Sequence, residues 1–136
     1  MAVNIQFSIA VHLMAGLAYR GDKDTTSAVL ARSVNTSPSF VRRTLAKLSR
    51  AGLIETVTGK AGACWLSRDA KDISLLDIYR AVDAPRAFSI HCYAEQKACA
   101  VSCHIKAALD KALDKTQKAM ESTLKEITLA KVVSEL

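Results

Sequence analysis

The sequence predicts a mostly α-helical domain with a small β-hairpin, extended by a long C-terminal helix. Apolar residues recur at spacings of three and four through most of the chain, which is typical of helices that bury one face. Residues 53–68, LIETVTGKAGACWLSR, instead combine β-branched and apolar residues around a glycine turn, which indicates two short strands. With 136 residues, half of them hydrophobic, the chain is long enough for one domain with its own core and a helical arm.

Three helices are expected before the hairpin. Residues 4–19 carry a wide apolar stripe, which predicts a mostly buried helix that ends before RGDKD. Thr25 or Thr26 is suited to cap a second helix. Ser37 followed by Pro38 predicts the start of a third, because serine caps free amides and proline fits the first helical turn. This third helix closes at Gly52.

The third helix has one apolar and one basic face. Val41, Leu45 and Leu48 share the apolar face at spacings of four and three. The outward-facing side chains are Ser39, Arg42, Arg43 and Lys47. Gly59 and Lys60 are expected to form the turn of the hairpin that follows. Helix, turn, basic helix and hairpin is the order of a winged helix-turn-helix domain.

A long helix is expected near the C-terminus. Residues 74–82 first form a short amphipathic helix that Pro85 ends, and residues 99–124 then carry an apolar seam. The seam comprises Ile105, Leu109, Ala112, Leu113, Thr116, Ala119, Met120 and Leu124. Such a seam packs either on its own domain or on a second copy, and we favour a homodimer because operators usually offer two half-sites. Residues 127–133 would be a short closing helix.

These elements divide the chain into three parts. Residues 1–84 are the predicted winged helix-turn-helix domain, residues 85–98 a cysteine-containing sensor loop, and residues 99–136 the dimerisation helix with its closing helix. The net charge of +6 comes mostly from the N-terminal half: residues 1–60 have eight basic against three acidic residues, and residues 61–136 have eleven against ten. A clustered basic excess suits contact with nucleic-acid phosphates.

Neither a membrane span nor a secretory signal is expected. No apolar run approaches the roughly 20 residues that cross a bilayer, and the N-terminal residues lack a leading basic cluster. We therefore expect a cytoplasmic protein without a membrane partner. In that compartment the four cysteines point to reduced thiols, metal ligation or redox chemistry rather than to a disulfide framework.

Three of the four cysteines lie close together in residues 91–104. If a helix begins near Cys99, then Cys99 and Cys103 lie one turn apart on the face of Lys106, away from the apolar seam. A thiol near a helix N-terminus and lysines gains thiolate character, and Cys92 could act as its resolving partner. Inert packing is the alternative for these thiols, and it is the interpretation we accept for Cys64. His12 is expected to be structural. 

The stretch VLARSVNTSPSFVRRTLAKLSRAGLIETVTGKAGACWLSRDAKDISLLDIYRAV, followed by the cysteine loop and a helix ending near ITLAKVV, resembles the Rrf-type winged-helix regulators, the family of IscR, NsrR and CymR. The resemblance covers essentially the whole chain. It implies a homodimeric DNA-binding transcriptional regulator, usually a repressor, whose long helices cross at the dimer interface. By position, it assigns DNA contacts to Ser39, Arg42, Arg43 and Lys47 of the recognition helix and to Lys60 of the wing. Thr58 stands where an arginine often precedes the wing glycine of the family.

Cluster-binding members of this family hold iron and sulfur with three loop cysteines roughly six residues apart and a fourth ligand from elsewhere. Here Cys92, Cys99 and Cys103 are separated by seven and four residues, which departs from that pattern. We therefore expect a cofactor-free sensor of oxidants or electrophiles. An iron-sulfur cluster or other metal, held by these cysteines with His91 or His104, is the alternative. An enzyme is not expected, because the sequence has no phosphate-binding glycine loop and no obvious pair of catalytic carboxylates.

Overall fold

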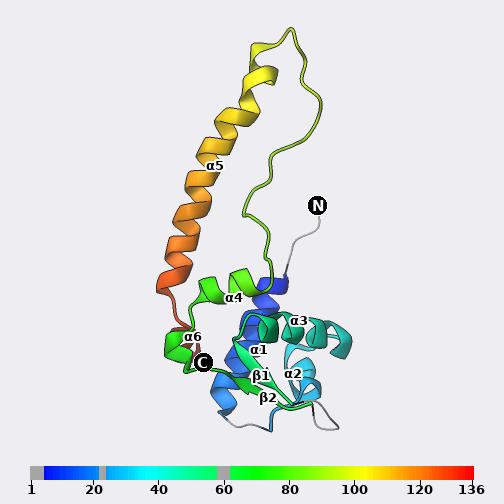
Figure 1. Ribbon diagram of the computed structural model, residues 1–136, viewed down its shortest axis with the longest axis vertical. Helices are drawn as coiled ribbons and strands as arrows, with labels where there is room; N and C mark the ends of the chain where they lie inside the picture. The colour runs from blue at the N-terminus through cyan, green and yellow to red at the C-terminus, as the bar shows by residue number, and fades with distance from the viewer. Residues whose placement is uncertain (1–4, 22–23, 58–61) are drawn as a thin grey trace.

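The chain folds in the predicted order of helices and strands. The computed structural model describes residues 5–21, 24–57 and 62–136. Its elements are α1 (Gln6–Arg20), α2 (Ser27–Val34), α3 (Pro38–Arg50), β1 (Ile54–Thr56), β2 (Cys64–Leu66), the 3-10 helix η1 (Ala70–Asp72), α4 (Leu75–Ala81), α5 (Ala100–Glu126) and α6 (Leu129–Val133). The predicted fold class, mostly helical with a small β-wing and a long C-terminal helix, is confirmed (Figure 1).

The predicted start signals begin the helices of the helix-turn-helix. The Thr26 side chain caps α2 by accepting a hydrogen bond from the Val29 amide. The Ser37 hydroxyl caps α3 by accepting from the Phe40 amide at 3.3 Å, with Pro38 as the first helical residue. Between the two helices Asn35 takes a left-handed conformation, with φ 65°, which reverses the chain within a short turn. These local signals therefore define where α2 ends and where α3 begins.

The core lies around α1, which contacts α2, α3, α4, β2 and α6. Leu13 and Met14 of α1 are completely buried, as are Val41 and Leu48 on the predicted apolar face of α3. Leu129 of α6 is also completely buried, so the last helix of the chain belongs to the same core. Burial of these side chains stabilises the domain by roughly 1.5–3 kcal/mol each.

The wing is a two-stranded antiparallel sheet. Ile54 pairs with Leu66, and Thr56 pairs with Cys64. The Cys64 amide donates to the carbonyl of Thr25 at 2.8 Å, which ties β2 to the start of α2. The predicted turn at Gly59 and Lys60, and Thr58 beside it, lie outside the described residues.

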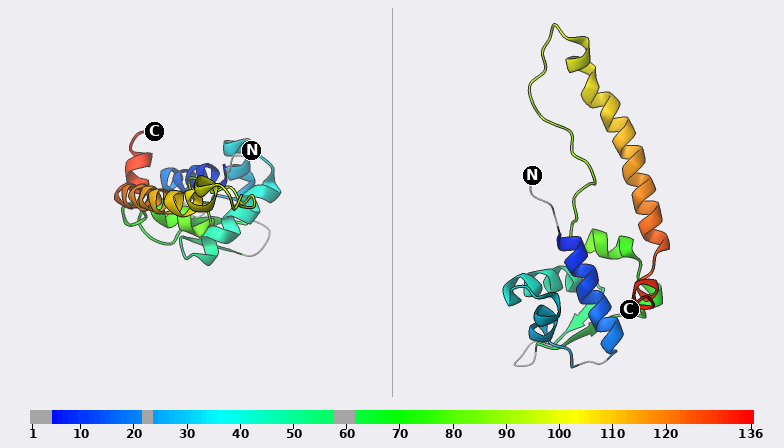
Figure 2. Two further views of the ribbon diagram at one scale, coloured as in Figure 1. Left: turned by 90° about the horizontal axis from the view of Figure 1, so that it is seen from above. Right: turned by 180° about the vertical axis from the view of Figure 1, so that it is seen from behind.

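Beyond α4 the chain leaves the domain and forms an arm. Residues 83–99 run outward, and α5 runs back alongside them to the domain (Figures 1 and 2). The sequence predicted this helix over residues 74–82, ahead of Pro85, and α4 spans Leu75–Ala81 with Ser74 and Val82 as its caps. Val82 is buried in the core, and Asp83 takes a left-handed conformation with φ 51° before the proline is reached.

The base of the arm is fastened to the domain by backbone hydrogen bonds. The Leu75 amide donates to the Ile127 carbonyl at 2.9 Å, and the Leu129 amide donates to the Ile73 carbonyl at 2.8 Å. After these contacts α6 packs against α1. Among the described residues, no helix combines the length and the apolar composition needed to cross a membrane.

Candidate nucleic-acid interface and cysteine segment

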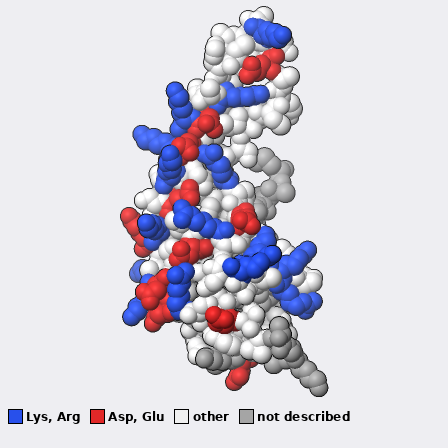
Figure 3. Space-filling model, viewed as in Figure 1, with Lys and Arg blue, Asp and Glu red and all other residues white. Residues whose placement is uncertain are grey.

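The exposed face of α3 carries the predicted DNA-contacting side chains. Ser39, Arg42 and Arg43 are exposed, on the side opposite the buried Val41 and Leu48. Figure 3 shows Lys and Arg side chains gathered on the side of the molecule where α3 lies. An exposed helix with a basic surface is suited to enter the major groove, whose phosphates attract the charge.

The four predicted α3 contacts differ in how they are held. The Arg43 guanidinium lies 5.6 Å from the centre of the Phe40 ring, so the ring supports its position. The Lys47 Nζ, half-buried, donates to Oε1 of Gln6 in α1 at 3.3 Å. Lys47 is therefore directed toward α1 as well as toward solvent, a position that the sequence did not predict.

A groove separates α3 from the wing. It has a volume of about 470 Å³, and Arg42 and Arg50 of α3 line it together with Thr56 and Val57 of the wing. Its two walls are the elements that a winged-helix protein presents to DNA. Lys60, the predicted DNA contact of the wing, lies outside the described residues.

The cysteine segment lies at the far end of the arm from the domain (Figure 1). Cys92 and Cys99 are exposed, and Cys103 is half-buried. The Cys99 Sγ caps α5 by accepting a hydrogen bond from the Ser102 amide at 3.4 Å. The Cys103 Sγ lies 3.6 Å from the Gln96 carbonyl and 3.7 Å from the Lys97 carbonyl, to which it donates. Helix α5 thus begins where the sequence predicted, and Cys103 faces the incoming loop.

Lys106, the lysine predicted to share a helix face with these thiols, makes its hydrogen bond to the loop. The Lys106 Nζ donates to the backbone carbonyl of Tyr93 and so fastens the loop to α5. The His91 ring lies beside the Tyr93 ring, with centroids 6.1 Å apart. The loop is therefore held on the same face of α5 that carries Cys103 and Lys106.

These residues, as arranged, do not fit a metal ion or cluster. Within the described part of the chain, no three His, Cys, Asp or Glu side chains are placed together to hold a metal. Cys99 caps a helix, whereas the Cys103 thiol is directed to carbonyls of the loop. Bound iron requires several ligands that converge on one point, so we derive no chemistry through a cluster.

Cys64 lies in a different environment. Its side chain is buried under the wing and donates to the Thr25 carbonyl at 3.7 Å. Burial raises the pKa of the Cys64 thiol to about 11, because the apolar surroundings disfavour the thiolate. This supports the interpretation of Cys64 as an inert packing residue. His12, also expected to be structural, pairs with the Ser33 hydroxyl at 3.0 Å.

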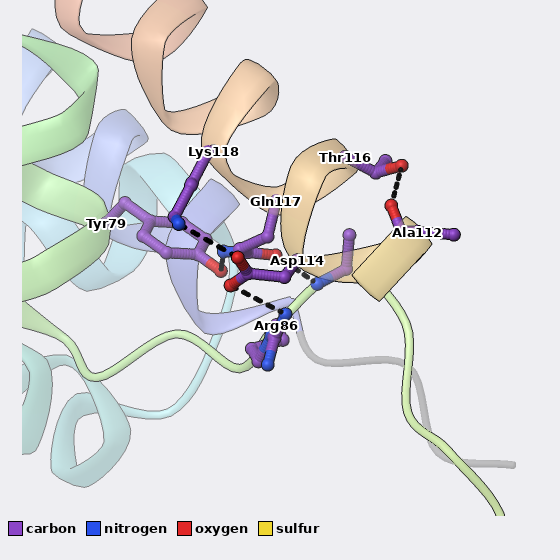
Figure 4. Close-up of polar contacts among 8 residues, drawn as sticks. Tyr79, Arg86, Ala112, Asp114, Thr116, Gln117 and Lys118 are labelled. Atoms are coloured by element: carbon purple, nitrogen blue, oxygen red, sulfur yellow. Dashed lines mark hydrogen bonds and ion pairs between the residues drawn. The ribbon is translucent and has the colours of Figure 1, made fainter. Parts of the chain in front are cut away.

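Sequence reasoning missed the buried Gln117, which lies where the arm meets α4 (Figure 4). Gln117 is the buried residue of α5, and its side chain contacts Tyr79 of α4 and the backbone at Ala87. Asp114 lies beside it and pairs with Lys118 at 2.9 Å, and Lys118 lowers the pKa of the Asp114 carboxyl through this hydrogen bond and its charge. The signal for Gln117 was its place four residues after Leu113 in the apolar seam.

The arrangement of α2, α3 and the wing defines the class of winged helix-turn-helix DNA-binding proteins. The chain belongs to the Rrf2 family, described as iron-dependent transcriptional regulators, which it matches over residues 3–135. It is a DNA-binding transcriptional regulator, as predicted, and the prediction that it is not an enzyme is confirmed by the family.

Individual relatives resemble the chain along nearly its whole length. YwnA of Bacillus subtilis (strain 168), a candidate HTH-type transcriptional regulator, is 36% identical over 98% of both chains. A crystal structure of a candidate DNA-binding protein shares 35% identity with a TM-score of 0.75 and covers 93% of this chain and 97% of its own. The oxidized form of Staphylococcus aureus CymR shares the fold, with 23% identity, a TM-score of 0.72 and coverage of 98% and 96%.

Proposed function

We propose that the protein is a homodimeric repressor in the cytoplasm whose operator binding weakens when oxidants or electrophiles modify Cys92, Cys99 and Cys103. The observation that carries this proposal is the placement of these thiols. They lie at the end of an arm that is fastened to the DNA-binding domain, and two of them are exposed. We also propose residues 1–84 as the DNA-binding domain, residues 85–98 as the sensor loop, and residues 99–136 as the dimerisation helix with the short closing helix that returns to the domain core.

The free face of α5 supports the homodimer. The loop lies along one face of α5, where it contacts Lys106 and Cys103. Another face leaves four apolar residues exposed, spaced by seven, four and seven: Val101, Ala108, Ala112 and Ala119. This spacing is that of two helices packing along their length, and small residues allow a close approach. A second copy of α5 would cover these side chains.

A dimer would present two copies of α3 to two half-sites. Ser39, Arg42, Arg43 and Lys47 would contact the major groove and adjacent phosphates, with Lys60 from the wing. The exposure of Arg42 supports base contact, because a guanidinium can donate two hydrogen bonds to one guanine. Both half-sites are bound together only when the two recognition helices have the matching separation. A small shift of the arms would therefore reduce affinity.

The proposed oxidation needs a hydroperoxide and two thiols. Sulfur of Cys99 attacks one peroxide oxygen; the S–O bond forms, the O–O bond breaks, and the thiol proton passes to the departing alkoxide or hydroxide. Sulfur of Cys92 then attacks the sulfenic acid; the S–S bond forms, the S–O bond breaks, and water leaves. The placement of Cys99 supports it as the first nucleophile, because its side chain is exposed at the start of α5, where the Ser102 amide contacts the sulfur.

The alternative is a regulator that binds an iron-sulfur cluster through these cysteines and His91 or His104. The iron-dependent description of the family favours it, while the spacing and placement of the cysteines oppose it. Anaerobic purification with visible absorption, iron, sulfide and zinc analysis, and free-thiol titration separates the two. We expect a colourless, metal-free protein with reactive thiols. Visible charge-transfer bands with stoichiometric iron and sulfide would overturn the thiol mechanism in favour of the cluster.

A further inference from the structure

We propose that Tyr79 and Gln117 are positioning residues that couple the arm to the recognition helix, an inference that rests on the proposed function. They form a polar joint, which we define as Tyr79, Pro85, Ala87 and Gln117. Figure 4 shows the Tyr79 and Gln117 side chains pointing toward one another. The joint connects α4 of the domain, the outgoing loop and the returning α5.

Hydrogen bonds run through the joint without interruption. The Ala87 amide donates to Gln117 Oε1 at 3.0 Å, and Gln117 Nε2 donates to the Tyr79 hydroxyl at 3.0 Å. The Tyr79 hydroxyl in turn donates to the Pro85 carbonyl. The buried Gln117 side chain therefore holds both the outgoing loop and α5 at the same point on α4. The Gln117 amide and the Tyr79 hydroxyl each make two hydrogen bonds, and a connected network of this kind favours one arrangement of its members.

The joint continues toward α3 through α1. The Tyr79 ring packs edge to face on Phe7 of α1, with centroids 5.6 Å apart and an interplanar angle of 73°. Gln6, the neighbour of Phe7, accepts the hydrogen bond from the Lys47 Nζ of α3. A shift of Tyr79 would thus reach the recognition helix through direct contacts. This continuous path is the physical reason to expect coupling between the arm and α3.

Two ion pairs at the same junction are poor candidates for transmission. Arg86 pairs with Asp114 at 3.7 Å, and Arg80 pairs with Glu121 at 3.6 Å. The arginines of both pairs are about half or more exposed, and exposed pairs are weak and screened by salt. Asp114→Asn therefore makes a matched control, because it removes ion pairs at the same junction and leaves the joint intact.

The test compares operator affinity before and after oxidation at fixed salt. Reduced protein is measured first and then protein treated with diamide, which takes up two electrons and two protons as two thiols close a disulfide. The variants are Tyr79→Phe, which removes only the hydroxyl, and Gln117→Met, which removes both hydrogen bonds at similar size. Thermal unfolding of each variant verifies that it folds, and either variant alone suffices if the other does not.

We expect oxidation to weaken operator binding about tenfold in the unmodified chain and in Asp114→Asn, but about twofold or less in Tyr79→Phe and Gln117→Met. Lost stability alone would lower affinity in both states and leave the ratio unchanged. A tenfold response in the two joint variants would overturn the coupling role and leave the proposed function standing. No response in the unmodified chain would overturn both, because the joint would then have no signal to transmit.

Discussion

The winged-helix domain and the arm differ in what holds them. In α1 five of 15 residues are buried and all five are hydrophobic, whereas in α5 one of 27 residues is buried and it is a glutamine. The domain is stabilised mainly by removing apolar surface from water. The arm is held by the hydrogen bonds of Gln117, by exposed ion pairs and by the backbone hydrogen bonds at its base. Moving the arm should therefore cost less free energy than disrupting the domain core. This difference suits the proposed control of a rigid DNA-binding domain by a movable arm.

Truncation of a core side chain should reduce stability more than truncation of a side chain at the end of the arm. Leu13→Ala should lower the free energy of unfolding by about 2–5 kcal/mol, because Leu13 is completely buried and the change leaves a cavity. Tyr93→Ala at the end of the arm should change it by less than about 0.5 kcal/mol, because Tyr93 is 80% exposed. Urea denaturation measures both. Equal losses would show that the arm contributes to the same cooperative core.

Thiol alkylation rates should differ between the domain and the arm. The pKa of Cys64 is about 11, so only on the order of one thiolate in a thousand is present at pH 8. Burial also keeps the reagent away. With iodoacetamide at pH 8, Cys92 and Cys99 should be modified at least about a hundredfold faster than Cys64, as measured by peptide mass spectrometry. Similar rates at all sites would mean that the wing opens readily.

Charge removal tests which part contacts DNA. Arg42→Ala on α3 should weaken operator binding by about 1–3 kcal/mol if Arg42 contacts a base edge, and reduce the salt slope by about one unit if it contacts phosphate. Lys115→Ala on α5 removes the same charge from the exposed surface of the arm and should have little effect. Titrations at several salt concentrations separate the two contributions. A larger loss from Lys115→Ala would place the DNA on the arm.

The sequence predicted most of the domain and the extent of the arm, but not how the two are joined. Caps at Ser37 and Thr26 and the apolar spacing of α1, α3 and α5 are local signals, so helix positions followed from them. The path of residues 83–99 has no periodic pattern and depends on distant contacts, such as that between Ala87 and Gln117. The sites assigned to Ser39, Arg42 and Cys99 remain predictions.

Removal of helix caps should produce the smallest changes in stability. Ser74 caps α4 in a reciprocal capping box with Asp77, and Ser74→Ala should cost about 1 kcal/mol of unfolding free energy. Cys99 caps α5 at the end of the arm, and Cys99→Ala should leave the global unfolding midpoint unchanged while it speeds amide exchange in the first turn of α5. A comparable loss of global stability from both changes would contradict the separation of domain and arm.

We propose that thiols at the end of the arm control DNA binding by the domain. The most direct measurement is operator affinity before and after oxidation, compared between the unmodified chain and the Cys92→Ser, Cys99→Ser, Cys103→Ser triple variant. Both should bind equally well when reduced, and only the unmodified chain should lose affinity on oxidation. An equal loss in the triple variant would contradict the claim, because the remaining cysteine, Cys64, is buried beneath the wing.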